Sequence, residues 1–307
     1  MFQRTGAAVT LLVLAILLLA VRGVLPSLRA QGTNAATAPV ATDAPTALAQ
    51  GEEAVRERHI PEAVADFSEA IKLRPDWEEA YMRRAAAKER QNNIYGAMQD
   101  FSHAVALNPQ DASAYERRGR MREISSDFSK AQEDFGEALQ LQPSRSDLYF
   151  RRGVTRMILG QWDGALSDLQ TFATRAPQMG NAGYAHLYLW YIGHAQGKAE
   201  EADHALGMAF EGQNAPWGTW TATIAEFLLS HVSQAELLDL ANVSTDDAHR
   251  NRHMLCEAWF YVGLKALVAG DKTGAATDFQ NCVNNGQFHL AEHEFASAKL
   301  KERSEGP

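Results

Sequence analysis

The sequence predicts an all-α protein, a right-handed superhelical solenoid of helical hairpins with a C-terminal capping helix. Three observations predict this fold class. A residue pattern recurs every 34 positions, and repeats of about 20 to 50 residues are typical of solenoids. Within each unit the apolar residues are three and four positions apart, as on one face of a helix. Each unit also ends at a proline, which lacks the N–H needed to continue a helix.

Several positions of the repeat keep one phase through four copies. Small residues are expected where the two helices of a hairpin cross, and aromatic or aliphatic residues fill the space beside them. Because no single hairpin buries both of its faces, neighbours are expected to stack and leave a concave groove lined by the first helices. The repeated residues are Pro75, Pro109, Pro143 and Pro177; Ala63, Ala97, Ala131 and Ala165; Phe67, Phe101, Phe135 and Leu169; and Gly51, Ala85, Gly119 and Gly153.

Residues 1–30 are expected to direct export. Arg4 precedes a mostly apolar, uncharged run over 7–21, which Arg22 closes. Fifteen helical residues span about 22 Å, less than the roughly 30 Å of a hydrocarbon core, which favours a cleaved signal peptide. The residues before position 31 make a poor cleavage site, so an uncleaved inner-membrane anchor through 7–25 stays open. No cysteine lies near this run to accept a lipid, and residues 31–45, rich in Ala, Thr and Pro, are interpreted as a linker.

The rest of the chain divides into three predicted parts. Residues 46–179 hold four hairpins, and residues 256–307 hold a last hairpin and a cap helix. Between them, residues 180–255 are expected to form a degenerate hairpin that turns at Gly197, followed by irregular helices. One of these helices is predicted to begin at a capping box made by Ser233 and Glu236.

The repeated residues resemble those of the tetratricopeptide repeat family in both period and position. The resemblance covers residues 44–179 and returns at 256–289. The C-terminal part also loosely resembles bacterial envelope repeat proteins of the NlpI lipoprotein type. The resemblance implies a non-enzymatic scaffold whose concave groove binds a protein or peptide partner. In the second region the matching residues are Trp259, Gly263, Ala275, Phe279 and Cys282.

The resemblance also implies which side chains line the groove. Guanidinium groups bind carboxylates through paired hydrogen bonds, so an arginine-rich groove in an acidic chain indicates an acidic peptide as ligand. The alternative is a solvated helix face on which these arginines pair with Glu116 and Glu123. The Lys and Asn of the family's carboxylate clamp are absent. The family geometry places Arg83, Arg117, Arg120, Phe150, Arg151 and Met157 in the groove.

A second arginine follows directly in each of three repeats, at Arg84, Arg118 and Arg152. In the family this position commonly carries Leu or Arg. A long apolar stem can pack between helices while its charged end reaches a polar group. A structural role is therefore expected for these three side chains.

Two cysteines, Cys256 and Cys282, lie in the last hairpin, at the start of its first helix and the end of its second. The hairpin folds back near Gly270, which brings these two ends together. A disulfide is one interpretation, since export would expose the thiols to an oxidising compartment. In the other, Cys282 fills a small-residue position as a free thiol. Both stay open.

The segment His289-Leu-Ala-Glu292-His293 spells H-x-x-E-H, a pattern used by one type of zinc peptidase. On a helix it would place two imidazoles and a carboxylate on one face. The short stretch that follows leaves no downstream third ligand, so an amphipathic cap helix is favoured. A zinc-dependent hydrolase remains the alternative function from another class.

Composition narrows the partners and the function. The chain of 307 residues carries a net charge of −9, the wrong sign for a protein that neutralises nucleic-acid phosphates. No phosphate loop, nucleophile motif or cofactor motif occurs in the sequence, so no catalytic residue, metal or cofactor is expected. The sequence therefore favours a periplasmic or secreted adaptor in a bacterial cell envelope. Self-association through exposed aromatic residues, such as Trp217 and Trp220, is a further alternative.

Overall fold

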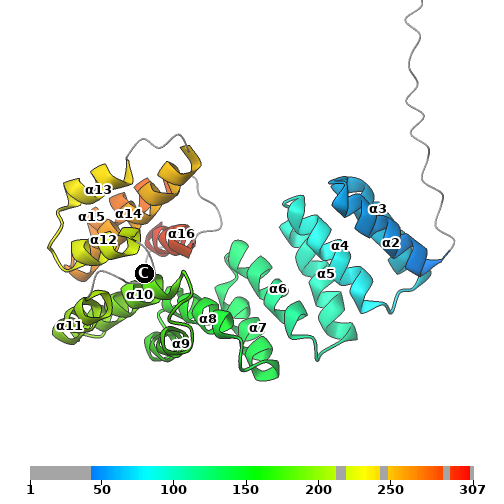
Figure 1. Ribbon diagram of the computed structural model, residues 1–307, viewed down its shortest axis with the longest axis horizontal. Helices are drawn as coiled ribbons and strands as arrows, with labels where there is room; N and C mark the ends of the chain where they lie inside the picture. Colours follow the sequence, from blue (N-terminus) through cyan, green and yellow to red (C-terminus); the bar gives the residue numbers. More distant parts are fainter. Residues whose placement is uncertain (1–42, 212–218, 243–247, 286–290, 305–307) are drawn as a thin grey trace, which may run out of the picture. The chain divides into compact units, whose positions relative to one another are not determined.

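The computed structural model describes residues 43–211, 219–242, 248–285 and 291–304, and every regular element among them is an α-helix (Figure 1). The predicted all-α fold class is confirmed. The predicted signal or anchor segment, 1–30, lies outside the described residues. The helices are α2 (Ala44–Arg56), α3 (Ile60–Leu73), α4 (Glu78–Arg90), α5 (Ile94–Leu107), α6 (Ala112–Ile124), α7 (Phe128–Leu141), α8 (Ser146–Ile158), α9 (Trp162–Arg175), α10 (Ala182–Ala195), α11 (Ala199–Phe210), α12 (Thr219–Leu228), α13 (Gln234–Ala241), α14 (Ala248–Val268), α15 (Lys272–Asn284) and α16 (Ala291–Ser304).

The helices from α2 to α9 form four hairpins, each one period of the sequence. In every hairpin the first helix packs on the second, and the second packs on the first helix of the next hairpin (Figure 1). Each first helix ends in the same kind of turn. Its turn contains a residue with positive φ at one repeat position, namely Arg58, Asn92, Ser126 and Gly160. This left-handed residue reverses the chain so that the second helix returns along the first.

Close helix crossings explain the conserved phase of the small residues. A Cβ added at Gly119 would lie 2.8 Å from the ring of Phe135, and one added at Gly153 would lie 2.8 Å from Leu169. Only a residue without a side chain leaves room for these fully buried groups. The predicted role of small residues at the crossings is thus confirmed.

A buried ion pair holds together the two helices of the second, third and fourth hairpins. The guanidinium groups of Arg84, Arg118 and Arg152 each donate two or more hydrogen bonds to Asp100, Asp134 and Asp168, respectively, from the second helix. A second cation on the same first helix contacts each carboxylate, so every buried aspartate has two positive partners. These cations are Lys88, Arg122 and Arg156.

The same arginines also lie over tyrosine rings of their own helices. Arg118 is 5.4 Å from the ring of Tyr115, and Arg84 and Arg152 are each 5.7 Å from the rings of Tyr81 and Tyr149. The expected structural role of the second arginines is what the structure shows. Their aspartate partners recur every 34 residues, as the prolines do. These aspartates were not included in the repeat pattern of the sequence analysis.

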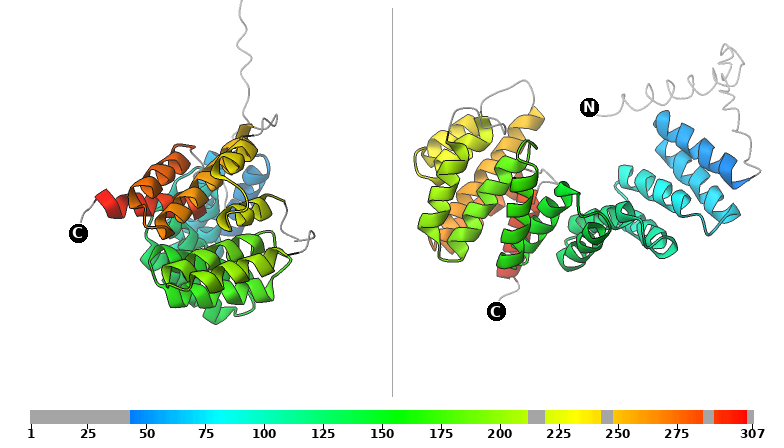
Figure 2. Two further views of the ribbon diagram at one scale, coloured as in Figure 1. Left: turned by 90° about the vertical axis from the view of Figure 1, so that its left-hand side faces the viewer. Right: turned by 60° about the horizontal axis from the view of Figure 1, so that its bottom comes forward.

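The C-terminal part departs from the regular stacking, in line with the degenerate hairpin and irregular helices expected over 180–255 (Figure 2). The hairpin of α10 and α11 turns at Gly197, where φ is +76°. Ser233 and Glu236 form the predicted capping box at the start of α13. The hairpin of α14 and α15 turns at Gly270, where φ is +86°. The last helix, α16, packs on α15 and α14 and also contacts α8 of the fourth hairpin.

One hydrophobic core runs from α8 into the C-terminal helices. Its centre is aromatic: Tyr188 of α10 packs against Phe260 and Tyr261 of α14, and Phe260 packs against Phe295 of α16. All four side chains are at most 1% exposed. This core fixes α14 and α16 relative to α8 and α10, which matters because these four helices supply most of the site described next.

Candidate functional site

A cavity of about 740 Å³ lies between the first helices of three repeats and the C-terminal helices. The ends of α4 and the inner faces of α6 and α8 supply one side, and α10 continues it. Two helices of the irregular part, α14 and α16, supply the opposite wall. Such a volume falls within the range of about 300–1,000 Å³ typical of ligand sites.

Three of the six predicted groove residues line this cavity: Arg120, Phe150 and Arg151. Arg83 and Arg117 lie on the same series of first helices but are not part of its lining. The placement of Met157 in the groove is wrong, because its side chain is fully buried in the core between α8 and its neighbours. A thioether at this position stabilises the helix packing instead of contacting a ligand.

The groove arginines have glutamate partners one repeat upstream. Arg117 and Arg120 each approach Glu89 to 3.4 Å, and Arg151 donates to Glu123 at 3.1 Å. Arg83 pairs in the same way with Glu52 at 3.2 Å. These pairs satisfy the guanidinium groups within the protein, so the arginines are not free to bind the carboxylate of a ligand. The structure is closer to the alternative interpretation, in which the arginines form ion pairs on the helix face. The partner of Arg117, however, is Glu89 and not Glu116.

The charge of the cavity is opposite to the one expected for an acidic ligand. Seven carboxylates line it, against two arginines and one histidine. Four of the carboxylates accept ion pairs from arginine, and they belong to the repeat side. The other three, Glu257, Glu292 and Glu294, stand on α14 and α16 and are called the acidic wall below.

The acidic wall is held by neutral donors. Glu257 accepts hydrogen bonds from the Tyr184 hydroxyl at 2.8 Å and from the Trp220 indole at 2.6 Å. Its only cationic contact within the described residues is His253, 3.3 Å away on the same helix. Glu292 accepts a hydrogen bond from the Tyr188 hydroxyl. These neutral donors orient the carboxylates without neutralising their charge.

Burial perturbs the protonation of this wall. The pKa of Glu292 is raised to about 7, because burial and then the nearby Glu257 disfavour its ionised form. Burial together with Glu123 raises the pKa of Glu294 to about 8, although Arg151 acts in the opposite direction. The hydrogen bond to Glu257 raises the pKa of His253 above its ordinary value. Such shifts indicate carboxylates with too little positive charge around them.

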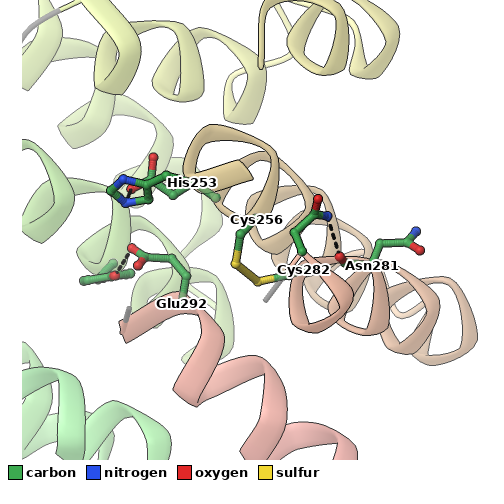
Figure 3. Close-up of a disulfide and its surroundings, with 8 residues drawn as sticks. His253, Cys256, Asn281, Cys282 and Glu292 are labelled. Atoms are coloured by element: carbon green, nitrogen blue, oxygen red, sulfur yellow. Dashed lines mark hydrogen bonds and ion pairs between the residues drawn. A yellow bond between two sulfur atoms is a disulfide. The ribbon is translucent and has the colours of Figure 1, made fainter. Parts of the chain in front are cut away.

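A disulfide between Cys256 and Cys282 lies directly behind the acidic wall and joins α14 to α15 (Figure 3). Of the two interpretations of the cysteines, the structure agrees with the disulfide and not with the free thiol. Cys256 precedes Glu257 in the chain, and Figure 3 shows His253 and Glu292 on the same side of the sulfur bridge. The cross-link therefore fixes the part of α14 from which the wall residues project.

The H-x-x-E-H segment contributes a residue to the acidic wall and not to a metal site. His289 lies outside the described residues, whereas Glu292 is buried and hydrogen-bonded to Tyr188. Among the residues that the structure describes, no group of three His, Cys, Asp or Glu side chains is arranged to hold a metal ion. Glu292 belongs instead to the acidic wall, on a helix whose Phe295 packs in the core.

Sequence reasoning missed the acidic wall because its members come from two helices, α14 and α16, that are separate in the chain. His253, Glu257 and Glu294 are not among the residues predicted to line the groove. Trp220, expected among exposed aromatics for self-association, is half-buried and donates to Glu257, while Trp217 lies outside the described residues. One signal was present: Glu257 stands in an otherwise apolar run from Met254 to Leu264, where an unpaired charge is unusual.

No helix within the described ranges has both the length and the apolar character that a membrane crossing requires. The apolar run over 7–21 lies outside these described ranges.

A family model described as tetratricopeptide repeat matches residues 48–112 and 125–180. These ranges cover the helices from α2 to α5 and from α7 to α9, whose crossings and turns repeat every 34 residues, and leave out α6. These seven helices match the tetratricopeptide repeat model. The cavity is therefore built on the first helices of successive hairpins, of which α4 and α8 lie in the matched ranges, together with helices that the family model does not cover.

Known proteins also resemble parts of this chain. A curated lipoprotein NlpI homolog from Haemophilus influenzae is 26% identical over 113 residues, which are 36% of this chain and 35% of the relative. The chain thus matches about a third of that relative's length. A tetratricopeptide repeat protein from Parabacteroides merdae superposes with a TM-score of 0.58 at 14% identity, over 84% of this chain and 98% of the other. The MamA protein gives a TM-score of 0.51 at 17% identity, over 55% and 90%, respectively. The Parabacteroides merdae protein and MamA therefore share the fold of this chain over the regions they cover.

Proposed function

We propose that this protein is a non-enzymatic adaptor, exported to a bacterial cell envelope, which holds a segment of a partner protein in the cavity between its repeats and α16. The cavity carries this proposal. It combines a concave series of first helices with a wall of buried polar groups that the C-terminal helices place opposite them. A fold used only for mechanical spacing would not require such groups, each of which costs free energy to bury.

The chemistry of the lining supports binding over catalysis. Phe150 and Val154 of α8 and Tyr184 and Tyr188 of α10 offer apolar and aromatic surface to a ligand. Most of the polar groups are engaged with one another in hydrogen bonds or ion pairs. A peptide segment needs both kinds of contact, since apolar area supplies affinity and placed polar groups supply orientation.

Three observations support the envelope as the location. The apolar run over 7–21, with arginine on both sides, has the composition of an export segment. The curated relative from Haemophilus influenzae is described as a lipoprotein. A disulfide in the last hairpin fits an oxidising compartment outside the cytosol.

Site-specific crosslinking in the native host tests the proposal. The photoreactive residue p-benzoylphenylalanine replaces Asn181, which lines the cavity, in one variant and Glu137, which is exposed on α7, in the other. Illumination is expected to join the first variant, and not the second, to a discrete protein. Equal crosslinking at both positions, or none at Asn181 in cells where the chain is folded and present, would contradict the proposal.

A further inference from the structure

The acidic wall is a feature that the repeat architecture does not explain. In the repeats, each buried aspartate has two cations. At the wall, three glutamates share one histidine, and the nearest arginine, Arg151, already pairs with Glu123. Carboxylates removed from water without a counter-charge are costly, so they persist where a ligand supplies the missing charge.

The fully buried Tyr261 gives a second, independent observation at this place. Its ring stacks on Tyr188, and its hydroxyl interacts electrostatically with Glu292 and Glu257. Within the part of the chain that the structure describes, no polar atom meets this hydroxyl in good hydrogen-bond geometry, although the Tyr188 hydroxyl lies close enough to lower the pKa of Tyr261. A buried hydroxyl is normally satisfied, so polar capacity beside the wall is left over for a further donor or acceptor.

We propose that the cavity receives a lysine or arginine side chain of an extended partner segment, with its cationic group at Glu257, Glu292 and Glu294. The charge of the lining selects a cation, and the apolar neighbours Phe150 and Val154 select a polypeptide over a small ion. The long aliphatic stem of lysine or arginine matches this gradient, since it crosses apolar surface while its head reaches the carboxylates. This inference rests on the proposed adaptor function and names the chemistry of its ligand.

The arrangement also makes binding depend on pH. A cation favours the ionised glutamates, so protons leave the wall as the side chain enters, and the affinity rises as the pH increases from about 6 to about 8. Every packed element contributes groups that face the wall: Glu123 from α6, Arg151 from α8, Tyr184 and Tyr188 from α10, His253 and Tyr261 from α14. Among them, the hydrogen bond to Glu257 raises the pKa of His253, and the imidazole also favours an incoming cation once it is neutral.

Selection from a random peptide display library tests the inference with three forms of the full chain. The first is the wild type, and the second carries Glu257→Gln, Glu292→Gln and Glu294→Gln. The third is a matched control with Glu62→Gln, Glu133→Gln and Glu200→Gln, which changes the net charge equally at exposed positions outside the cavity. Circular dichroism and thermal unfolding establish that each variant is folded. If the triple wall variant does not fold, Glu294→Gln alone replaces it, since this carboxylate makes no hydrogen bond within the described residues.

We expect the wild type and the control to enrich lysine or arginine at one peptide position, and the wall variant to lose this preference. In a selected peptide, norleucine in place of that lysine is expected to weaken binding about tenfold to the wild type and little to the wall variant. Spermidine is expected to compete only weakly. Selected peptides without lysine or arginine, an unchanged preference in the wall variant, or spermidine binding more tightly than any peptide would each overturn the inference alone. Failure to select any sequence contradicts the proposed adaptor function itself.

Discussion

Two regions of this protein bury carboxylates, and they treat them in opposite ways. In the tetratricopeptide repeats, Asp100, Asp134 and Asp168 are at most 4% exposed at the side chain and each contacts two cations. In the C-terminal part, Glu257 and Glu292 are equally buried but are held by tyrosine and tryptophan. The first arrangement neutralises charge and joins helices. The second leaves carboxyls without a counter-charge beside a cavity and raises the pKa of Glu292 and Glu294, and this difference separates acids that join helices from acids available for binding.

The largest expected effect comes from breaking one neutralised pair. Asp134→Ala removes the carboxylate and leaves Arg118 and Arg122 facing each other at low exposure. Loss of one partner of a buried pair typically lowers the free energy of unfolding by about 3–5 kcal/mol. Urea denaturation followed by circular dichroism measures the change.

The first repeat supplies a matched control for this substitution. Asp66 occupies the position of Asp134, but Gln50 and Ala54 stand where the cations are in later repeats. Burial and Glu62 raise the pKa of Asp66, as expected of a carboxylate without a cation. Asp66→Ala is therefore expected to cost far less. Equal destabilisation by the two substitutions would show that the ion pairs do not account for the role of the repeated aspartates.

Loss of the disulfide is expected to have the next largest effect. Cys256→Ser with Cys282→Ser opens a loop whose ends are 26 residues apart. In the chain-entropy model, the free energy of unfolding falls by about 3–4 kcal/mol. Thermal unfolding measures this loss, and addition of a reductant to the wild type should reproduce it. Two free thiols in protein purified from its native compartment would contradict the bridge.

The acidic wall predicts a stability that falls as the pH rises. A carboxyl whose pKa is raised on folding binds its proton more tightly in the folded state, so folding loses stability between the ordinary glutamate range and the raised values. For Glu292 and Glu294 these values are about 7 and about 8. We expect Glu292→Gln with Glu294→Gln to stabilise the protein by about 2 kcal/mol near pH 9 and to have little effect near pH 5.

Urea denaturation at both pH values measures this difference, and Glu133→Gln on the exposed surface is the control. A gain of the same size at both pH values would attribute the effect to packing. A loss near pH 9 would mean that the ionised glutamates stabilise the fold, contrary to the comparison drawn above.

The smallest expected effect concerns the turns of the repeats. Ser126 adopts φ of +61° at the position where the fourth repeat has Gly160. A left-handed backbone costs a residue with a side chain about 1 kcal/mol more than it costs glycine. We therefore expect Ser126→Gly to raise the free energy of unfolding by somewhat less than about 1 kcal/mol, and Gly160→Ala to lower it by a similar amount. Calorimetry of the two variants gives both signs.

The sequence predicted most of the fold and little of the site, for one physical reason. Helix spacing, prolines and crossing glycines act within 34 residues, so a periodic search finds them, and the turns at Gly197 and Gly270 follow from local chemistry. The site depends on α16 returning to α8 across more than a hundred residues. No local pattern places Glu292 beside Tyr188, and the arginines of the groove gave the wrong sign of charge because their glutamate partners lie one repeat away.

The titration of the wall glutamates tests the account most directly. In protein labelled with carbon-13 at the glutamate carboxyls, nuclear magnetic resonance follows each signal with pH, and the variants Glu292→Gln and Glu294→Gln assign two of them. The account predicts that these two carboxyls titrate near pKa values of about 7 and about 8, and that both move downward when a lysine-bearing peptide is added. Titration of both in the ordinary glutamate range, unchanged by such a peptide, would contradict it.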